Sequence, residues 1–212
     1  MVRVLTVAAV AALAGVAHGA TFGFERISSN SSINVESQLS VELVDAGSGK
    51  VDVIFRNAVG VASNVATVYI DDGATGNTFA SGSLHSQIGA NFTFGTGTPP
   101  NLPGGNQASV NFQVTPGFIA DMTGHPNNGL NAAADQLVLR FVLRDGKSFD
   151  DAVDAATDGL LRFGMHVRSI GTDGESDGFV TRGGDRPPII PLPSAAGLGL
   201  FGLGLAATRR RR

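Results

Sequence analysis

Two neighbouring stretches of the chain alternate apolar and polar residues with a period of two. Residues 39–44 place Leu, Val and Leu at every second position, and residues 51–56 place Val, Val and Phe in the same way. Successive side chains of a strand point to opposite faces, so each stretch predicts a strand with one buried face. The segment 45–49 between them, Asp-Ala-Gly-Ser-Gly, is typical of a turn. The sequence therefore predicts an antiparallel hairpin and favours an all-β fold.

Short apolar stretches separated by Gly, Asn, Asp and Ser continue along the middle of the chain. This spacing is typical of an antiparallel all-β domain, so we expect a β-sandwich of the jelly-roll-like or Ig-like kind. The further expected strands are residues 65–70, 109–114, 136–143 and 160–170, with weaker candidates at 22–27, 78–83 and 178–182.

One short helix is expected within this domain. Ser148 suits its N-cap, and the acidic residues that follow suit the positive end of the helix dipole. Asp158 and Gly159 mark its end. The helix is expected to pack on the sheet as a connector, through the apolar residues that share one face at helical spacing: Phe149, Ala152, Val153 and Ala156.

The composition limits the kinds of chemistry that are possible. The chain contains no cysteine, so its core must hold it together alone and thiol chemistry is excluded. Arg3 and the four terminal arginines contribute +5 to the whole-chain charge of −3, so the segment between them carries −8. Nucleic acids need a basic surface, and no nucleic-acid partner is expected for this acidic segment.

The N-terminus has the three parts of a secretory signal peptide. Arg3 supplies the positive charge, residues 4–16 are continuously apolar, and the segment 17–20, Ala-His-Gly-Ala, supplies small residues for cleavage. We expect cleavage after Gly19 or Ala20. Residues 1–20 are therefore interpreted as the signal peptide and residues 21–185 as the β-sandwich domain.

The C-terminus also has three parts, which follow a short linker at residues 186–190. A proline motif precedes an apolar, glycine-rich run, and the chain ends on four arginines. About twenty residues at about 1.5 Å each just span a hydrocarbon core of about 30 Å. The arginines would stay cytoplasmic, which places the domain outside the membrane. The parts of this segment, 191–212, are Pro191, Leu192 and Pro193, then residues 194–208, then Arg209, Arg210, Arg211 and Arg212.

This order of proline motif, apolar helix and terminal arginines resembles the PEP-CTERM sorting signal of Gram-negative and planctomycete bacteria. In that family an exosortase, a membrane cysteine transpeptidase, processes the tail. The usual motif is Pro-Glu-Pro, and Leu192 stands here where the glutamate would be. The resemblance implies export to the cell surface or extracellular matrix, an exosortase-type partner, and transient or stable anchoring in the inner membrane.

The body of the chain also resembles an uncharacterised group of PEP-CTERM proteins, which has no assigned activity. At the level of the family, such proteins are associated with exopolysaccharide and with the biofilm matrix, which implies extracellular polysaccharide as a partner. The stretches that carry the resemblance are residues 22–24, 69–73, 101–106 and 161–167.

The glycines at 197, 199 and 202 match the spacing of a dinucleotide-binding turn. That motif needs a strand before it, a βαβ unit after it and an acidic residue about twenty positions further on. Only ten residues follow Gly202, and none is acidic. We therefore expect no nucleotide cofactor and interpret the run as a membrane helix.

Asp173, Glu175 and Asp177, with Gly178 in sixth place, resemble the first half of a calcium-binding loop. The twelfth position, where a bidentate acid is expected, is Gly184, and no predicted helix flanks the segment. A polar turn between two strands is the favoured interpretation. A weak extracellular calcium site is the alternative, and no metal is predicted.

Three functional hypotheses stay open. His85, His125 and His166 lie far apart in the sequence without a catalytic motif, so a non-catalytic structural or matrix protein is favoured over an enzyme. The first alternative is a carbohydrate-binding module that uses the Pro- and Gly-rich loop 89–107 and the neighbouring sheet face. The absence of Trp and the single Tyr69 count against it. The second alternative is a glycan-active hydrolase with two carboxylates from the Asp-rich loops.

Overall fold

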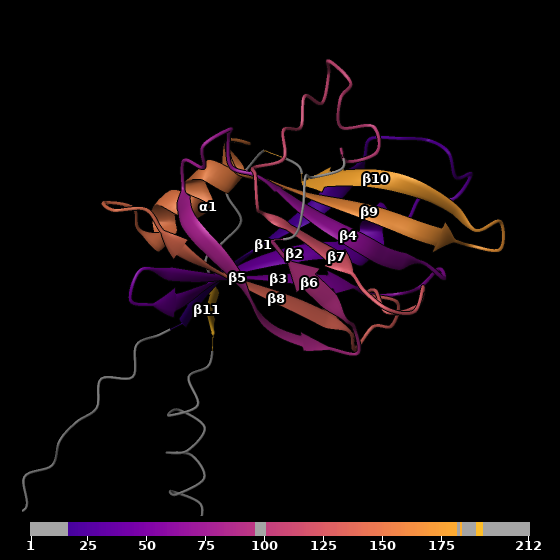
Figure 1. Ribbon diagram of the computed structural model, residues 1–212, viewed down its shortest axis with the longest axis horizontal. Coiled ribbons are helices and arrows are strands. Elements are labelled where there is room, and N and C mark those ends of the chain that lie inside the picture. The colour runs from indigo at the N-terminus through magenta and orange to yellow at the C-terminus, as the bar shows by residue number, and fades with distance from the viewer. Residues whose placement is uncertain (1–16, 96–100, 182, 184–189, 193–212) are drawn as a thin grey trace, which may run out of the picture.

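The computed structural model describes residues 17–95, 101–181, 183 and 190–192. This part of the chain is an antiparallel β structure with one α-helix (Figure 1). Its elements are β1 (Ala17–Arg26), the 3-10 helix η1 (Glu36–Gln38), β2 (Leu39–Gly47), β3 (Lys50–Asn57), β4 (Asn64–Asp71), β5 (Phe79–Ile88), β6 (Phe92–Phe94), β7 (Ile119–Met122), β8 (Gln136–Leu143), α1 (Phe149–Thr157), β9 (Arg162–Ile170), β10 (Glu175–Thr181) and β11 (Ile190–Leu192).

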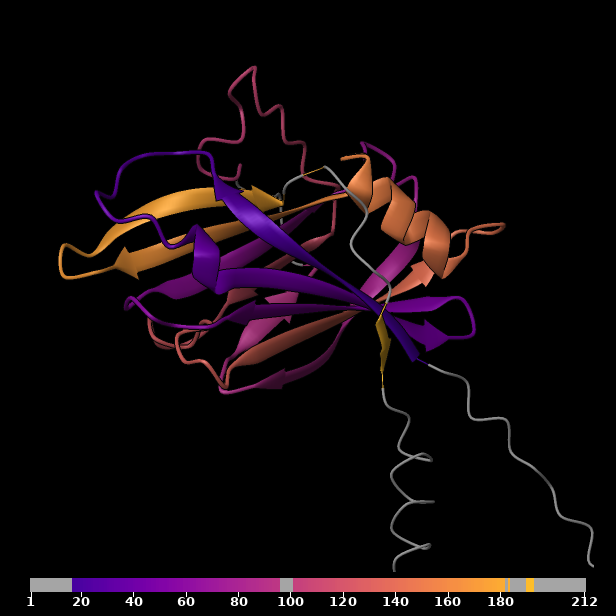
Figure 2. The ribbon, with the colours of Figure 1, turned by 180° about the vertical axis from the view of Figure 1, so that it is seen from behind.

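Ten of the described strands follow one hydrogen-bonded path, β5-β8-β3-β2-β1-β10-β9-β4-β7-β6, and β11 pairs with β1 beside it. Strand β1 joins the two halves of this path, because residues 19–23 pair with β2 and residues 24–26 pair with β10. The two strands at the ends of the path, β5 and β6, are consecutive in the sequence, so a short connection keeps them close together. The sheet is therefore curled and nearly closed (Figures 1 and 2). The predicted antiparallel all-β fold with one helix is confirmed.

The core lies between the two halves of the curled sheet. In the predicted hairpin, every second residue is buried from Leu39 to Leu43 in β2 and from Val51 to Asn57 in β3, which confirms the alternation of residues 39–44 and 51–56. Phe55 of β3 meets Phe163 of β9 edge-on, with ring centroids 5.9 Å apart. Because β3 and β9 belong to opposite halves of the path, this contact shows the two halves packing face to face.

Four phenylalanines fill the core where the ends of the sheet approach each other. Phe141 of β8 stacks on Phe79 of β5, with centroids 4.4 Å apart, and meets the rings of Phe94 and Phe118 edge-on. Gly82 of β5 makes room for this cluster, since a Cβ there would lie 2.5 Å from the Phe141 ring and 2.8 Å from the Phe94 ring. Aromatic packing therefore links β5 to β6 across the seam.

Helix α1 has the predicted cap and the predicted buried face. The Ser148 side chain accepts a hydrogen bond from the backbone N–H of Asp151, and the Asp151 carboxylate accepts one from the backbone N–H of Ser148. The hydrogen bonds from Ser148 lower the pKa of the exposed Asp151 carboxyl. The residues that α1 buries are those predicted from the sequence: Phe149, Ala152, Val153 and Ala156.

Removing this capping box is expected to weaken the domain modestly. The substitution Ser148→Ala leaves the backbone N–H of Asp151 without its side-chain acceptor, which costs about 1 kcal/mol of unfolding free energy. Urea unfolding of the two proteins measures the difference. Ser86→Ala, at an exposed serine of β5, is the matched control and should unfold like the wild type. Equal stability of Ser148→Ala and wild type would contradict a role for the box.

The expected strand at residues 109–114 is wrong. Asn111 has a left-handed backbone with φ of 43°, and the N–H groups of Val110 and Asn111 both donate to the carbonyl of Gln107 in a turn. The apolar residues of this stretch instead pack as a loop on the outside of the sheet, where Phe112 joins Leu102 and others in a second, smaller cluster. Their alternation therefore reflects loop packing and not a strand.

Several other boundaries differ from the prediction. Strand β5 runs to Ile88, beyond the weaker candidate at residues 78–83, and β9 begins two residues after Leu160, which is 68% exposed. Strand β10 begins earlier than expected, at Glu175. The short strands β6 and β7 were not predicted, and β6 lies within the expected loop 89–107.

Strand β1 begins at Ala17, so the expected end of the signal peptide lies within a strand. Residues 17–19 pair with residues 190–192 of β11, and Ala20 is only 1% exposed and pairs with Leu43. No helix in the described part of the chain is long and apolar enough to cross a membrane. The expected apolar segments 4–16 and 194–208, most of the linker, Pro193 and the terminal arginines lie outside the described residues.

Candidate functional site

A polar hollow lies where β1 leaves the sheet. Its volume is about 450 Å³, and Gln107, from the loop between β6 and β7, lines one side of it. Five of its six lining residues are polar, so it can offer hydrogen bonds to a ligand. We call it the polar hollow, and its lining residues are Arg26, Ile27, Ser28, Ser29, Asn30 and Gln107.

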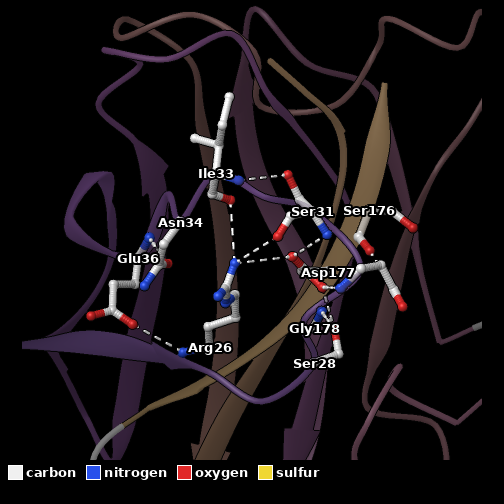
Figure 3. Close-up of polar contacts among 10 residues, drawn as sticks. Arg26, Ser28, Ser31, Ile33, Asn34, Glu36, Ser176, Asp177 and Gly178 are labelled. Atoms are coloured by element: carbon white, nitrogen blue, oxygen red, sulfur yellow. Dashed lines mark hydrogen bonds and ion pairs between the residues drawn. The ribbon is translucent and has the colours of Figure 1, made fainter. Parts of the chain in front are cut away.

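The Asp177 carboxylate of β10 holds one wall of the polar hollow in place (Figure 3). It accepts hydrogen bonds from the Ser28 hydroxyl at 2.7 Å and from the backbone N–H groups of Asn30 at 2.8 Å and Ser31 at 3.2 Å. The Ser28 oxygen in turn accepts from the backbone N–H of Gly178 at 2.8 Å. Asp177 is 0% exposed, so these bonds form away from solvent and fix the loop against β10.

Arg26 supplies the positive charge next to this buried carboxylate. Its Nη1 lies 3.7 Å from Asp177 Oδ2 and donates to the carbonyls of Ser31 at 3.0 Å and Ile33 at 3.4 Å. The backbone N–H of Arg26 donates to the carboxylate of Glu36 at 3.2 Å. The guanidinium therefore neutralises Asp177 and ties the far end of the loop to the same centre (Figure 3).

A glycine lets the opposite wall of the polar hollow approach the sheet. A Cβ on Gly178 would lie 1.9 Å from the carbonyl oxygen of Pro103, so only glycine allows this close approach. Gln107, a few residues further along, donates through Nε2 to the carbonyl of Ile27 at 3.1 Å. The two walls, about eighty residues apart in the sequence, are therefore directly bonded to each other.

The structure separates the three acidic residues of the candidate calcium loop. Asp173 and Glu175 are exposed on the β9–β10 hairpin, while Asp177 points inward and is committed to residues 28–31. Among the described residues, no group of three or more His, Asp or Glu side chains is placed to hold a metal ion. The residues of this pattern instead form the start of β10, and its Asp177 carboxylate holds the loop of residues 28–31.

Other buried aspartates hold loops in the same way. Asp72 accepts hydrogen bonds from the backbone N–H groups of Thr78 and Phe79, and Asp135 accepts from those of Asn131 and Ala132. The neighbouring Asp71 pairs with Arg162 and accepts from the N–H of Gln113. The Asp-rich loops proposed for an acid pair thus use these carboxylates to fix their own backbone. Of these, Asp72 carries a local signal, because it is followed by Gly73 and Asp-Gly after a strand is typical of a turn, whereas Asp135 is followed by Gln136.

The three histidines singled out from the sequence lie on different elements, and the fourth, His18, is exposed on β1. His85 is exposed on β5, His125 is exposed in the loop after β7, and His166 is half-buried on β9. Burial lowers the pKa of the His166 imidazole, the charge of Arg168 lowers it further, and Asp121 acts in the opposite direction. His166 lies within the strand that was predicted at residues 160–170.

This pKa shift gives the stability a pH dependence. Because the imidazole binds its proton less readily in the folded chain, the unfolded state takes up more protons as the pH falls through about 6.5. The contribution of His166 to stability is therefore present above that pH and is lost below it. Urea unfolding between pH 5 and pH 8 should show a smaller acid loss in His166→Gln than in the wild type. Equal losses in both proteins would contradict this role.

A second hollow of about 520 Å³ lies at the seam between β5 and β6. Its lining is mainly apolar and includes Leu84, Phe92 and Phe94. It shares no residue with the polar hollow, so the two can be altered independently.

Comparisons of the chain with protein-family models, with curated proteins and with solved structures found no match.

Proposed function

We propose that the chain is an exported, non-catalytic β-sandwich protein of the jelly-roll-like or Ig-like kind. It is displayed at the cell surface or in the extracellular matrix of a Gram-negative or planctomycete bacterium, after sorting through its C-terminal segment by an exosortase-type enzyme. The observation that carries this proposal is the order of the last 22 residues: the Pro191–Pro193 motif, the apolar run 194–208 and the arginines 209–212.

The placement of β1 supports display of the polar hollow on the side of the domain that faces away from the membrane. In the chain before signal-peptide cleavage, residues 17–19 at the start of β1 pair with β11, from which the C-terminal segment continues, and the last residue of β1, Arg26, lines the polar hollow. A strand rises about 3.3 Å per residue, so the two sites lie roughly 25 Å apart along β1. Figures 1 and 2 show β11 and the loop after β1 at opposite ends of the domain. A domain anchored through its tail would therefore present the polar hollow away from the membrane.

The buried carboxylates support a role without catalysis. A glycan-active hydrolase needs two carboxyl groups facing one cleft, about 5 Å or 6.5–9.5 Å apart. Asp71, Asp72 and Asp177 instead accept hydrogen bonds from backbone N–H groups of the loops that they hold. Such carboxylates stabilise loops, and their bonds would have to break before they could act on a substrate.

The proline motif is testable in cells. We expect the full chain to leave the membrane fraction for the surface or matrix fraction, and the double substitution Pro191→Ala and Pro193→Ala to keep most of the protein in the inner membrane. The matched control, Pro187→Ala with Pro188→Ala, changes the same number of prolines just upstream. Fractionation with immunoblotting measures all three. A motif variant that sorts like the wild type, or wild-type protein found in the cytoplasm, would overturn the proposal.

A further inference from the structure

We infer that the start of β1 holds the proline motif in a sheet until the signal peptide is removed, so that cleavage at the N-terminus precedes processing of the tail. This order rests on the proposed function and regulates its sorting step. Residues 17–19 pair antiparallel with residues 190–192 of β11, which include the first two residues of the motif. The residues that lie opposite each other are Ala17 and Leu192, His18 and Pro191, and Gly19 and Ile190.

The start of β1 is a firm partner for β11 because it continues a strand of the core. Ala20 and Phe22 are buried, and residues 19–23 pair with β2. Gly19 pairs with Val44 of β2 as well as with β11, so β11 occupies the edge of β1 that faces away from β2. In the described part of the chain, β11 pairs with β1 alone. Its strand pairing there depends entirely on residues 17–19.

A paired strand is a poor substrate for a transpeptidase. Enzymes that cut or transfer peptides bind an extended segment through its backbone N–H and C=O groups, as in other forms of strand addition. β11 must therefore leave β1 before an enzyme can bind the motif. The rate of processing falls with the fraction of chains in which β11 has left. One or two backbone hydrogen bonds are enough to lower that fraction about tenfold.

The expected cleavage site coincides with the end of this contact. Cleavage after Gly19 removes all three residues that pair with β11, and it leaves Ala20 and the rest of β1 paired with β2. Figure 2 shows β11, in yellow, beside the start of β1, in indigo. The same cut therefore frees the motif and leaves the core strand in place. A chain that folds with its signal peptide attached keeps its motif paired.

The first test follows the order of the two cuts in cells by pulse labelling and intact mass. We expect the form that has lost only its signal peptide to appear before the form that is trimmed at both ends. When a signal-peptidase inhibitor is present, the uncleaved chain should lose its tail at least about tenfold more slowly.

Two variants at one position separate the contact from other effects of the inhibitor. Proline does not fit the interior of a sheet, so His18→Pro should open the contact, and its tail should be trimmed although the signal peptide is still attached. His18→Ala keeps the backbone donor and should behave like the wild type in treated cells. Both changes lie outside the proline motif, so recognition of the motif itself is unchanged.

The second test examines the contact in the purified full chain in detergent, without a processing enzyme. The chain contains no cysteine, so an introduced pair reports one contact. Ala17→Cys with Leu192→Cys should form a disulfide on oxidation, because the two positions lie opposite each other. Adding His18→Pro should slow this oxidation. The matched control is Thr21→Cys with Leu192→Cys, which should stay reduced because Thr21 lies roughly 13 Å further along β1.

Three results would overturn the inference and leave the proposed function intact. They are tail loss at an unchanged rate in wild-type chains that keep their signal peptide, equal behaviour of His18→Pro and His18→Ala in treated cells, and oxidation of the matched cysteine pair no faster than that of its control. Failure of the proposed function has a different signature, since untreated wild-type cells would then never trim the tail.

Discussion

Replacing Asp177 with alanine is expected to lower the unfolding free energy by about 3–5 kcal/mol, the usual cost of removing one partner of a buried charge pair. The carboxylate is 0% exposed and accepts hydrogen bonds from Ser28, Asn30 and Ser31. Its loss leaves those donors unsatisfied and leaves Arg26 without its partner. The largest local change should be faster hydrogen exchange at the amides of Asn30 and Ser31.

Two exposed acids on the same hairpin serve as controls for this effect. Asp173→Ala and Glu175→Ala each remove one negative charge, as Asp177→Ala does, but from a solvent-exposed position. Each should change the unfolding free energy by no more than about 0.5 kcal/mol. Asp177→Asn keeps the size of the side chain and should lie between alanine and the wild type. Chemical unfolding with hydrogen-exchange mass spectrometry measures both quantities. A loss at Asp177 no larger than that at Asp173 would mean that the carboxylate does not anchor the loop.

The substitution Gly178→Ala should cost about 3 kcal/mol, at the upper end of the usual range for overpacking. The added Cβ would lie 1.9 Å from the carbonyl oxygen of Pro103, and a backbone atom cannot move aside as a flexible side chain can. The loop that carries Pro103 must therefore separate from β10. This movement should also break the bond from Gln107 to Ile27 and open the polar hollow.

Gly23 of β1 is the matched control for this substitution. It lies in a strand like Gly178, and a Cβ there meets nothing within 4 Å. Gly23→Ala should therefore keep the wild-type stability or raise it by roughly 0.5 kcal/mol, because alanine loses less backbone entropy on folding. Thermal and urea unfolding of both variants compare the two sites. If Gly178→Ala is as stable as Gly23→Ala, the loop does not press against β10 as described.

Features set by neighbouring residues were predictable from the sequence. The hairpin of β2 and β3 follows from alternation and a glycine turn, and α1 follows from its capping serine and apolar face. The expected strand at residues 109–114 fails because Asn111 takes a left-handed conformation, which an apolar pattern does not reveal. The short strands β6 and β7 depend on pairing with each other and with β4, so they carry little local signal.

The polar hollow could not be predicted because its contacts join distant parts of the chain. Asp177 and Ser28 are 149 positions apart, and Gln107 and Ile27 are 80 apart. The pattern around Asp177 indicated a turn or a calcium loop, since no local signal points to a partner so far away. The only local signal is the run of short polar residues after β1, Ser28 to Ser31. Such side chains often bond to nearby backbone, so the run indicates a loop held by hydrogen bonds.

The end of the expected signal peptide shows a different ambiguity. Small residues at positions 17–20 suit both a cleavage site and a strand that packs closely against β2. Ala20, Phe22 and Phe24 are all buried, so the alternation of buried residues along β1 extends back to the expected cleavage site. Cleavage after Gly19 would keep Ala20 in the core and remove the three residues that pair with β11.

The most direct test of export and sorting is the intact mass of the protein recovered from the cell surface or matrix. We predict a chain that lacks its first 19 or 20 residues and ends near Pro191–Pro193, without the apolar run 194–208 and the arginines 209–212. A surface chain that keeps its whole tail would contradict processing at the motif. A chain that keeps residues 1–19 and is recovered from the cytoplasm would contradict the account as a whole.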